Sequence, residues 1–229
     1  ARFVLISSDK AAAPRSVMGA TKRLAERVAL AESARGARAI VVRFGNILGS
    51  SGSLLAIFRD RIRRGLPLSL TDPEATRYLM TAGEAVSLVM KADLIARRPE
   101  TYWLDMGEPV AIGPLTERLL ALEEAAGHPR VPVRVVGLGP GEKRNEELTT
   151  QGLRMCPTAH RRIWVARQRP DDAAAVREVV EGLRRLVEQE AAAATLDVLT
   201  EVVPDYHASG EARATAQRLS VPVSARRTA

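Results

Sequence analysis

Short apolar runs alternate with longer amphipathic stretches along most of the chain. Residues 3–7 form one apolar, β-branched run, and residues 39–44 form a second. Runs of this length are too short for helices and are typical of strands buried on both faces of a parallel sheet. Between them, residues 17–34 are rich in helix formers, with Ser16 as the N-cap and Gly36 as the stop signal. The pattern predicts a strand–helix–strand unit of an α/β protein.

The alternation continues to about residue 190. It predicts helices over 53–64, 83–96, 115–126 and 171–190, and short strands over 68–70, 101–106, 133–136 and 163–165. From residue 209 onward no apolar period survives, so we expect residues 209–229 to form a disordered tail.

Composition excludes several classes of function. The 229-residue chain has a net charge of +7, but no basic run exceeds three residues and aromatic residues make up 3%. Without stacking surfaces beside a basic patch, we expect no nucleic-acid partner. The single cysteine, Cys156, precludes an internal disulfide and fits a reducing, cytoplasmic compartment. The three histidines are too widely spaced for a metal site, and no apolar stretch approaches the roughly 20 residues that span a bilayer.

Candidate chemistry follows the first strand directly. Ser8, Asp9 and Lys10 come at its carboxyl end, the edge where open α/β sheets bind ligands. Met18 and Lys22 are four residues apart in the predicted helix, so both project from one face and could share a pocket with this cluster. The alternative is a solvated turn and an ordinary surface lysine. The scarcity of lysine, with only four in the chain, argues against that alternative.

These segments resemble the active-site region of the nucleotide-sugar 4,6-dehydratases, extended short-chain dehydrogenases/reductases of the CapD-like polysaccharide biosynthesis type. The resemblance begins with Ser8-Asp9-Lys10-Ala11, Pro14 and Met18-Gly19-Ala20-Thr21-Lys22-Arg23. Further similar motifs follow in family order: RFGNILGSSGS at 43–53, TRYLMT at 76–81, DMGEPV at 105–110, GEK at 141–143, PTAH at 157–160 and TEVVPDY at 200–206. Met18 stands where most of the superfamily has tyrosine, which resembles the large, membrane-anchored branch acting on UDP-N-acetylglucosamine.

The resemblance implies a Rossmann-like, doubly wound parallel sheet with a small α/β substrate-binding subdomain. We assign residues 1–66 to the C-terminal part of the catalytic domain and 67–170 to the interleaved subdomain. Residues 171–208 are assigned to C-terminal helices. No glycine-rich dinucleotide motif precedes Asp9. We therefore expect a fragment of a longer, homo-oligomeric, NAD-dependent enzyme at the cytoplasmic face of the inner membrane.

The resemblance also implies a reaction. Hydride passes from C4 of a UDP-bound hexose to NAD, water is lost across C5 and C6, and the hydride returns to C6. A protonated Asp9 would be the acid at O6, an unprotonated Lys10 the base at C5, and Ser8 a partner of the C4 oxygen. Lys22 would hold the nicotinamide ribose, whereas Met18 cannot accept a proton.

Substrate contacts are implied in the same way. Asn46 would contact the sugar nucleotide, Arg77 the UDP diphosphate, and Glu142 a ribose hydroxyl. Gly139 stands where the family usually has arginine, which weakens the expected grip on the diphosphate or uridine.

Two other functions stay open at this point. An epimerase of the same superfamily shares the hydride step but loses no water, and an epimerase acting at C4 has no need of an acid at O6. An inert fragment or binding module would recognise the UDP-sugar without turnover. The absent dinucleotide motif and Gly139 favour this last function for the chain by itself.

Overall fold

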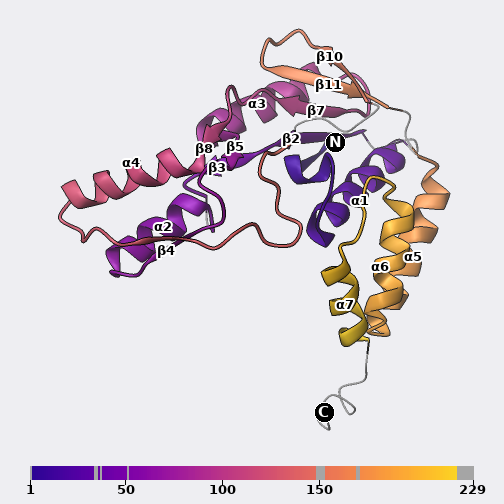
Figure 1. Ribbon diagram of the computed structural model, residues 1–229. Coiled ribbons are helices and arrows are strands. Elements are labelled where there is room, and N and C mark those ends of the chain that lie inside the picture. Colours follow the sequence, from indigo (N-terminus) through magenta and orange to yellow (C-terminus); the bar gives the residue numbers. More distant parts are fainter. Residues whose placement is uncertain are drawn as a thin grey trace.

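A computed structural model describes residues 2–33, 36, 38–50, 52–147, 153–168 and 171–220, and it shows an α/β protein (Figure 1). The helices are η1 (Asp9–Ala11, a 3-10 turn), α1 (Val17–Glu32), α2 (Leu54–Arg63), α3 (Ala82–Ile95), α4 (Ile112–Ala125), α5 (Ala173–Glu188), α6 (Ala192–Val202) and α7 (Gly210–Leu219). The strands are β1 (Arg2–Ser8), β2 (Arg38–Phe44), β3 (Asn46–Leu48), β4 (Leu68–Leu70), β5 (Thr76–Arg77), β6 (Leu79–Thr81), β7 (Thr101–Leu104), β8 (Val110–Ala111), β9 (Val133–Val135), β10 (Arg154–Pro157) and β11 (Ile163–Arg167).

The main sheet has the strand order β1-β2-β7-β11-β10. β1, β2 and β7 are parallel, whereas β11 and β10 run antiparallel to their neighbours. The predicted strand–helix–strand unit is confirmed, because β1 pairs with β2 in parallel register and α1 connects them. The fold class is therefore α/β with a mixed sheet.

Helices cover both faces of this sheet. On β2, Ile40 and Val42 pack in one cluster with α3, whereas Val41 packs in another with Leu30 of α1. Successive side chains of a strand point to opposite faces, so α3 and α1 lie on opposite sides (Figure 1). The apolar run of β2 is buried because each face has its own helix.

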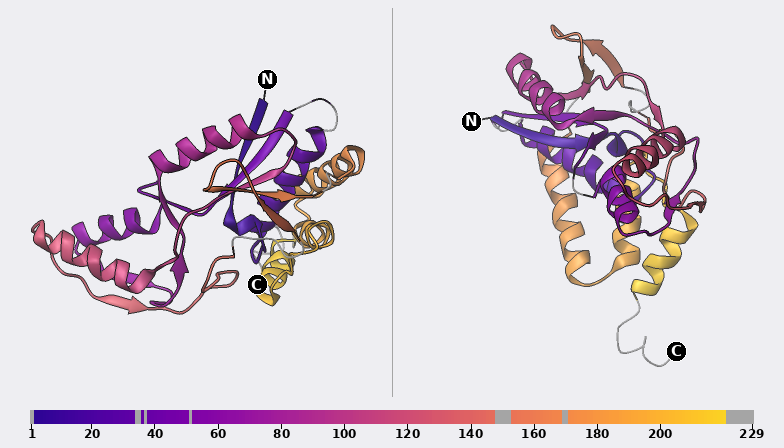
Figure 2. Two further views of the ribbon diagram at one scale, coloured as in Figure 1. Left: turned by 90° about the horizontal axis from the view of Figure 1, so that it is seen from above. Right: turned by 90° about the vertical axis from the view of Figure 1, so that its left-hand side faces the viewer.

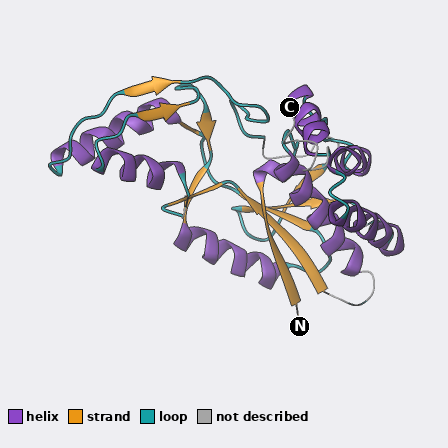
Figure 3. Ribbon diagram, turned by 90° about the horizontal axis from the view of Figure 1, so that it is seen from below, coloured by secondary structure: helices purple, strands orange, loops and turns teal. Residues whose placement is uncertain are grey.

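β1 does not match the prediction of a strand buried on both faces. It is the edge strand of the sheet (Figure 3), and within the described residues no strand pairs with its free edge. Phe3 is 55% exposed and Ile6 is 44% exposed. Their exposure follows from the edge position, where neither a neighbouring strand nor a helix covers these side chains.

A second, smaller lobe lies to one side of the sheet (Figure 2). Its core is one cluster, built by Phe58 and Ile62 of α2, Leu68 and Leu70 of β4, Leu119 and Leu120 of α4, and Val131. α2 therefore packs with the elements that follow it, although the boundary expected at residue 66 assigned it to the preceding domain. The lobe begins before residue 66 because the apolar face of α2 has its partners there.

The C-terminal helices α5 and α6 pack against α1, and α7 packs against α6 (Figure 1). The prediction of a disordered tail from residue 209 is wrong for residues 210–219, which form α7. Ser209 caps this helix by accepting a hydrogen bond from the Ala212 backbone N–H at 3.1 Å, and Ala216 is buried against α6. Ala212 and Ala216 supply the apolar contacts of α7 in this cluster, and their side chains are small, so the apolar period is too weak to be recognised in the sequence. Residues 221–229 lie outside the described part.

Candidate functional site

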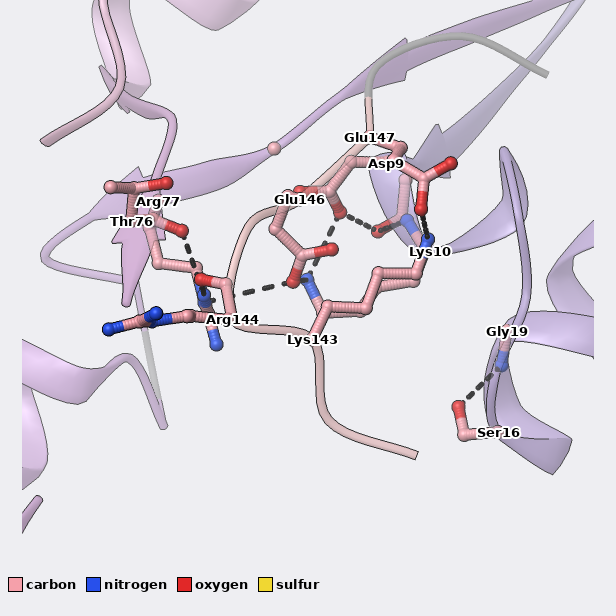
Figure 4. A network of polar contacts seen from close by, with 12 residues as sticks. Asp9, Lys10, Ser16, Gly19, Thr76, Arg77, Lys143, Arg144, Glu146 and Glu147 are labelled. Atoms are coloured by element: carbon pink, nitrogen blue, oxygen red, sulfur yellow. Dashed lines mark hydrogen bonds and ion pairs between the residues drawn. The ribbon is translucent and has the colours of Figure 1, made fainter. Parts of the chain in front are cut away.

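The Ser8–Lys10 cluster sits at the carboxyl end of β1, where the strand turns into η1. Asp9 is fully buried, and its Oδ1 accepts hydrogen bonds from Ser8 Oγ at 2.8 Å and from Lys10 Nζ at 3.0 Å. Its other oxygen, Oδ2, is buried and has no hydrogen-bond partner within the described structure. The structure thus brings together the three residues that the sequence placed at this strand end (Figure 4).

Gly45 and Asn46 form the neighbouring wall, directly after β2. A Cβ atom at Gly45 would lie 3.1 Å from Asp9 Oδ2, so the absence of a side chain lets this backbone approach the carboxylate. Asn46 Oδ1 is a second buried oxygen that lacks a hydrogen-bond partner in the described residues. Buried polar atoms are normally paired, and unpaired ones at adjacent strand ends are typical of a site for a polar ligand.

A loop carrying Glu146 meets the same cluster from the other side. Glu146 Oε1 lies 3.5 Å from Lys10 Nζ and 3.7 Å from Arg77 Nε (Figure 4). Arg77 is on β5, and its Nη1 also donates to the carbonyl oxygens of Thr76 and Arg144 at 2.7 and 3.0 Å. Two predicted site residues from distant parts of the chain, Lys10 and Arg77, are therefore linked through one carboxylate that the sequence analysis did not single out.

Lys143 is a further residue that was missed. It is buried, and its Nζ forms an ion pair with Glu147 Oε1 at 3.3 Å but makes no hydrogen bond to any residue that the structure describes. The sequence held a signal for Glu146 and Lys143, because the basic pair at 143–144 is followed, after one asparagine, by the acidic pair Glu146–Glu147. Opposite charges so close together in a loop suggest a charged cluster, but they do not reveal which residues they contact.

Met18 and Lys22 lie apart from these contacts. Both are exposed on α1, and within the described residues Lys22 makes no hydrogen bond or ion pair. The start of α1 nevertheless packs tightly on η1, because a Cβ atom at Gly19 would lie 2.6 Å from the Lys10 carbonyl oxygen. The structure thus fixes the helix beside the cluster without bringing the Lys22 side chain into it.

Glu142 is also separate from the cluster. Its carboxylate accepts a hydrogen bond from the Gly139 backbone N–H at 3.0 Å, closing a turn over residues 139–142. It lines a cavity of about 630 Å³ together with Pro14, Arg15 and His207. No contact in the described structure joins Glu142 to Asn46 or Arg77, so its proposed role at a ribose stays a prediction.

The described residues form neither a metal site nor a complete dinucleotide site. In the part of the chain that the structure describes, no group of three or more His, Cys, Asp or Glu side chains is arranged to hold a metal ion. No described helix is both long enough and apolar enough to cross a membrane. For a dinucleotide, Lys22 offers one exposed cation beside the edge strand, but no glycine-rich phosphate-binding turn occurs in the sequence. The residues present therefore do not fit a whole NAD molecule.

Comparisons with known proteins place these features in context. The sequence pattern of a family described as "polysaccharide biosynthesis protein" matches residues 1–168. The probable polysaccharide biosynthesis protein EpsC of Bacillus subtilis is 47% identical over 148 residues, covering 64% of this chain and 24% of EpsC. The capsular polysaccharide biosynthesis protein CapD of Staphylococcus aureus is 46% identical over 153 residues, covering 64% and 25%. The chain thus spans about a quarter of these relatives.

More distant relatives include the UDP-glucose 4-epimerase of Rickettsia canadensis, 32% identical over 154 residues that cover 66% of this chain and 44% of the epimerase. Among solved structures, Pen from Bacillus thuringiensis superimposes with a TM-score of 0.62 at 26% identity, covering 78% of this chain and 61% of Pen. DesIV, a dTDP-glucose 4,6-dehydratase from Streptomyces venezuelae with NAD bound, gives 0.56 at 22% identity over 65% of this chain and 51% of DesIV. The likeness to DesIV supports a shared fold.

Proposed function

Because the chain belongs to the polysaccharide biosynthesis protein family, we propose that it carries the substrate-side machinery of a 4,6-dehydratase that acts on a UDP-N-acetylhexosamine. The observation that carries the proposal is the Asp9–Lys10 pair at the carboxyl end of β1. There, a buried carboxylate with one unpaired oxygen touches an amine at 3.0 Å. β1, β2 and β7 would then be strands of a Rossmann-like sheet.

Loss of water across C5 and C6 requires a proton donor at O6 and a proton acceptor at C5. The unpaired Asp9 Oδ2 is the position from which a protonated carboxyl would donate to O6. Lys10, in its unprotonated form, would take the proton from C5. Because the two side chains are in contact, they can serve adjacent carbon atoms of one sugar, and the Ser8 hydroxyl beside them would bind the C4 oxygen.

The remaining contacts would hold the nucleotide. Arg77 would bind the diphosphate, since a guanidinium pairs with phosphate oxygens in a fixed planar geometry. Asn46 would use its unpaired Oδ1 toward the sugar nucleotide, and Glu142 would accept from a ribose hydroxyl. DesIV is solved with NAD bound, but the sequence of this chain has no glycine-rich phosphate-binding turn, so the hydride steps are not assigned to its residues.

Epimerisation is the second candidate function. It is favoured by the 32% identity to a UDP-glucose 4-epimerase. The cluster itself favours dehydration, because an acid beside a base suits elimination and epimerisation at C4 eliminates nothing. The two reactions differ in product mass, since dehydration removes one water and epimerisation leaves the mass unchanged.

Binding of UDP-N-acetylglucosamine tests the proposal without requiring turnover. Calorimetry on the 229-residue chain is expected to show binding that Arg77→Met weakens about tenfold or more, since a hydrogen bond to a charged group contributes roughly 1.5–3 kcal/mol. Arg134→Met is the matched control, because Arg134 is exposed on β9 and should leave the dissociation constant unchanged. The proposal would be contradicted if the unmodified chain, Arg77→Met and Arg134→Met bound UDP-N-acetylglucosamine with equal affinity, or if the unmodified chain showed no binding at millimolar concentrations of this ligand.

A further inference from the structure

Glu146 places a carboxylate between Lys10 and Arg77, two side chains that the proposed function assigns to the substrate. Its Oε1 is shared by Lys10 Nζ at 3.5 Å and Arg77 Nε at 3.7 Å. The Glu146 side chain is only 5% exposed, so it fills space inside the site rather than extending into solvent. Figure 4 shows it between the strand carrying Arg77 and the turn carrying Lys10.

The contacts are those of a loosely held anion. Strong charge-assisted hydrogen bonds between nitrogen and oxygen are about 2.7–2.9 Å long, and both distances to Glu146 are longer. Glu146 lies outside every helix and strand, just after the bridge between Thr76 and Asn145. Its side chain can therefore leave the cations without disrupting a helix or strand.

We propose that Glu146 is a resident anion: in the empty site its carboxylate occupies the position, between Lys10 and Arg77, that a phosphate group of a nucleoside diphosphate takes on binding. The inference rests on the proposed function, in which Arg77 binds the diphosphate and Lys10 faces the sugar. Ligand binding is then an exchange of one anion for another. In the empty protein, Glu146 keeps a carboxylate beside these two partly buried side chains. It also lowers ligand affinity, because the carboxylate competes for the same nitrogen atoms.

Inorganic pyrophosphate is the probe that tests this exchange directly. Glu146→Gln keeps the size of the side chain and removes its charge, so we expect the 229-residue chain to bind pyrophosphate about tenfold more tightly, a size consistent with losing two weak ion pairs. Glu147→Gln is the matched control. It removes the same charge at the next residue, but the Glu147 carboxylate pairs with Lys143 and not with Lys10 or Arg77. Its dissociation constant should stay within about twofold of the unmodified chain. Adding Arg77→Met to Glu146→Gln should abolish the gain.

Each outcome decides between the alternatives. Unchanged or weaker pyrophosphate binding by Glu146→Gln overturns the inference, as does a complete lack of binding, because the freed cations should then attract an anion. An equal gain in Glu147→Gln also overturns it, since the effect would be one of overall charge. Tighter pyrophosphate binding without preference for UDP-N-acetylglucosamine would support the resident anion and contradict the proposed function. Thermal unfolding of each variant checks that the fold is retained.

Discussion

Replacing Glu26 with methionine is expected to lower the free energy of unfolding by about 3–5 kcal/mol, the cost typical of breaking a buried ion pair. Glu26 and Arg43 are both fully buried between α1 and β2. Arg43 Nε donates to Glu26 Oε1 at 2.6 Å, and Arg43 Nη2 donates to Oε2. Ser7 Oγ donates to the same carboxylate at 2.5 Å, so the pair links β1, β2 and α1.

The loss is large because the remaining arginine cannot become neutral. Without Glu26, the Arg43 guanidinium would lose both hydrogen bonds to this carboxylate, although the Ala11 carbonyl at 3.3 Å and the ring of Trp103 at 4.7 Å would remain. Arg43→Met should cost less, because Glu26 still has Ser7 and Arg23 as partners. The double variant Glu26→Met/Arg43→Met should be more stable than Glu26→Met alone.

Urea unfolding followed by circular dichroism measures these differences. Glu188→Gln is the control, because Glu188 pairs with Arg184 on the exposed side of α5 and should change stability by less than about 0.5 kcal/mol. A double variant whose loss equals the sum of the single losses would show that the two buried charges are not coupled.

Gly19→Ala is expected to destabilise the protein by about 3 kcal/mol, although alanine usually stabilises a helix relative to glycine. A Cβ atom at position 19 would lie 2.6 Å from the Lys10 carbonyl oxygen and 3.2 Å from Pro14 Cβ. These atoms belong to the turn that positions Asp9 and Lys10, so α1 must move away from it. Overpacking of this kind costs about 1–3 kcal/mol, and we expect the upper end because the contact is with backbone.

Gly182→Ala, also a glycine-to-alanine change within a helix, is expected to stabilise the protein. Gly182 lies within α5, and no other heavy atom would come within 4 Å of its new Cβ. This variant should therefore gain about 0.5–1 kcal/mol. Thermal unfolding of both variants separates the two effects. A neutral or stabilising Gly19→Ala would show that α1 does not press on η1 as described.

Much of the main sheet could be predicted from the sequence because its signals are local. The apolar runs gave β1 and β2, and the residues after β1 placed Ser8, Asp9 and Lys10 at the strand end where the structure has them. Both predictions depend on chain neighbours within a few residues. Helix propensity and the cap at Ser16 likewise gave the start of α1, where Ser16 accepts from the Gly19 N–H.

Other features could not be predicted because they depend on contacts between distant residues. Glu26 and Arg43 look like ordinary charged residues until α1 packs on β2, and Glu146 gains meaning only when its loop reaches Lys10 and Arg77. The exposure of Phe3 follows from strand order, which no local pattern encodes. Lys22 was placed correctly in the helix α1 by the sequence. Its position in the helix nevertheless did not determine which groups its side chain contacts.

The position of the smaller lobe also constrains how a nascent chain can fold. β2 and β7 are neighbours in the sheet, yet the chain between them first builds α2, β4 and α3. β7, which covers the second edge of β2, is formed only by Thr101–Leu104. During synthesis, β2 must therefore wait with this edge unpaired until the smaller lobe's α2 and β4, and then α3, have emerged. Such non-local pairing slows folding, so we expect this chain to depend on molecular chaperones more than a protein whose sheet neighbours follow one another in sequence.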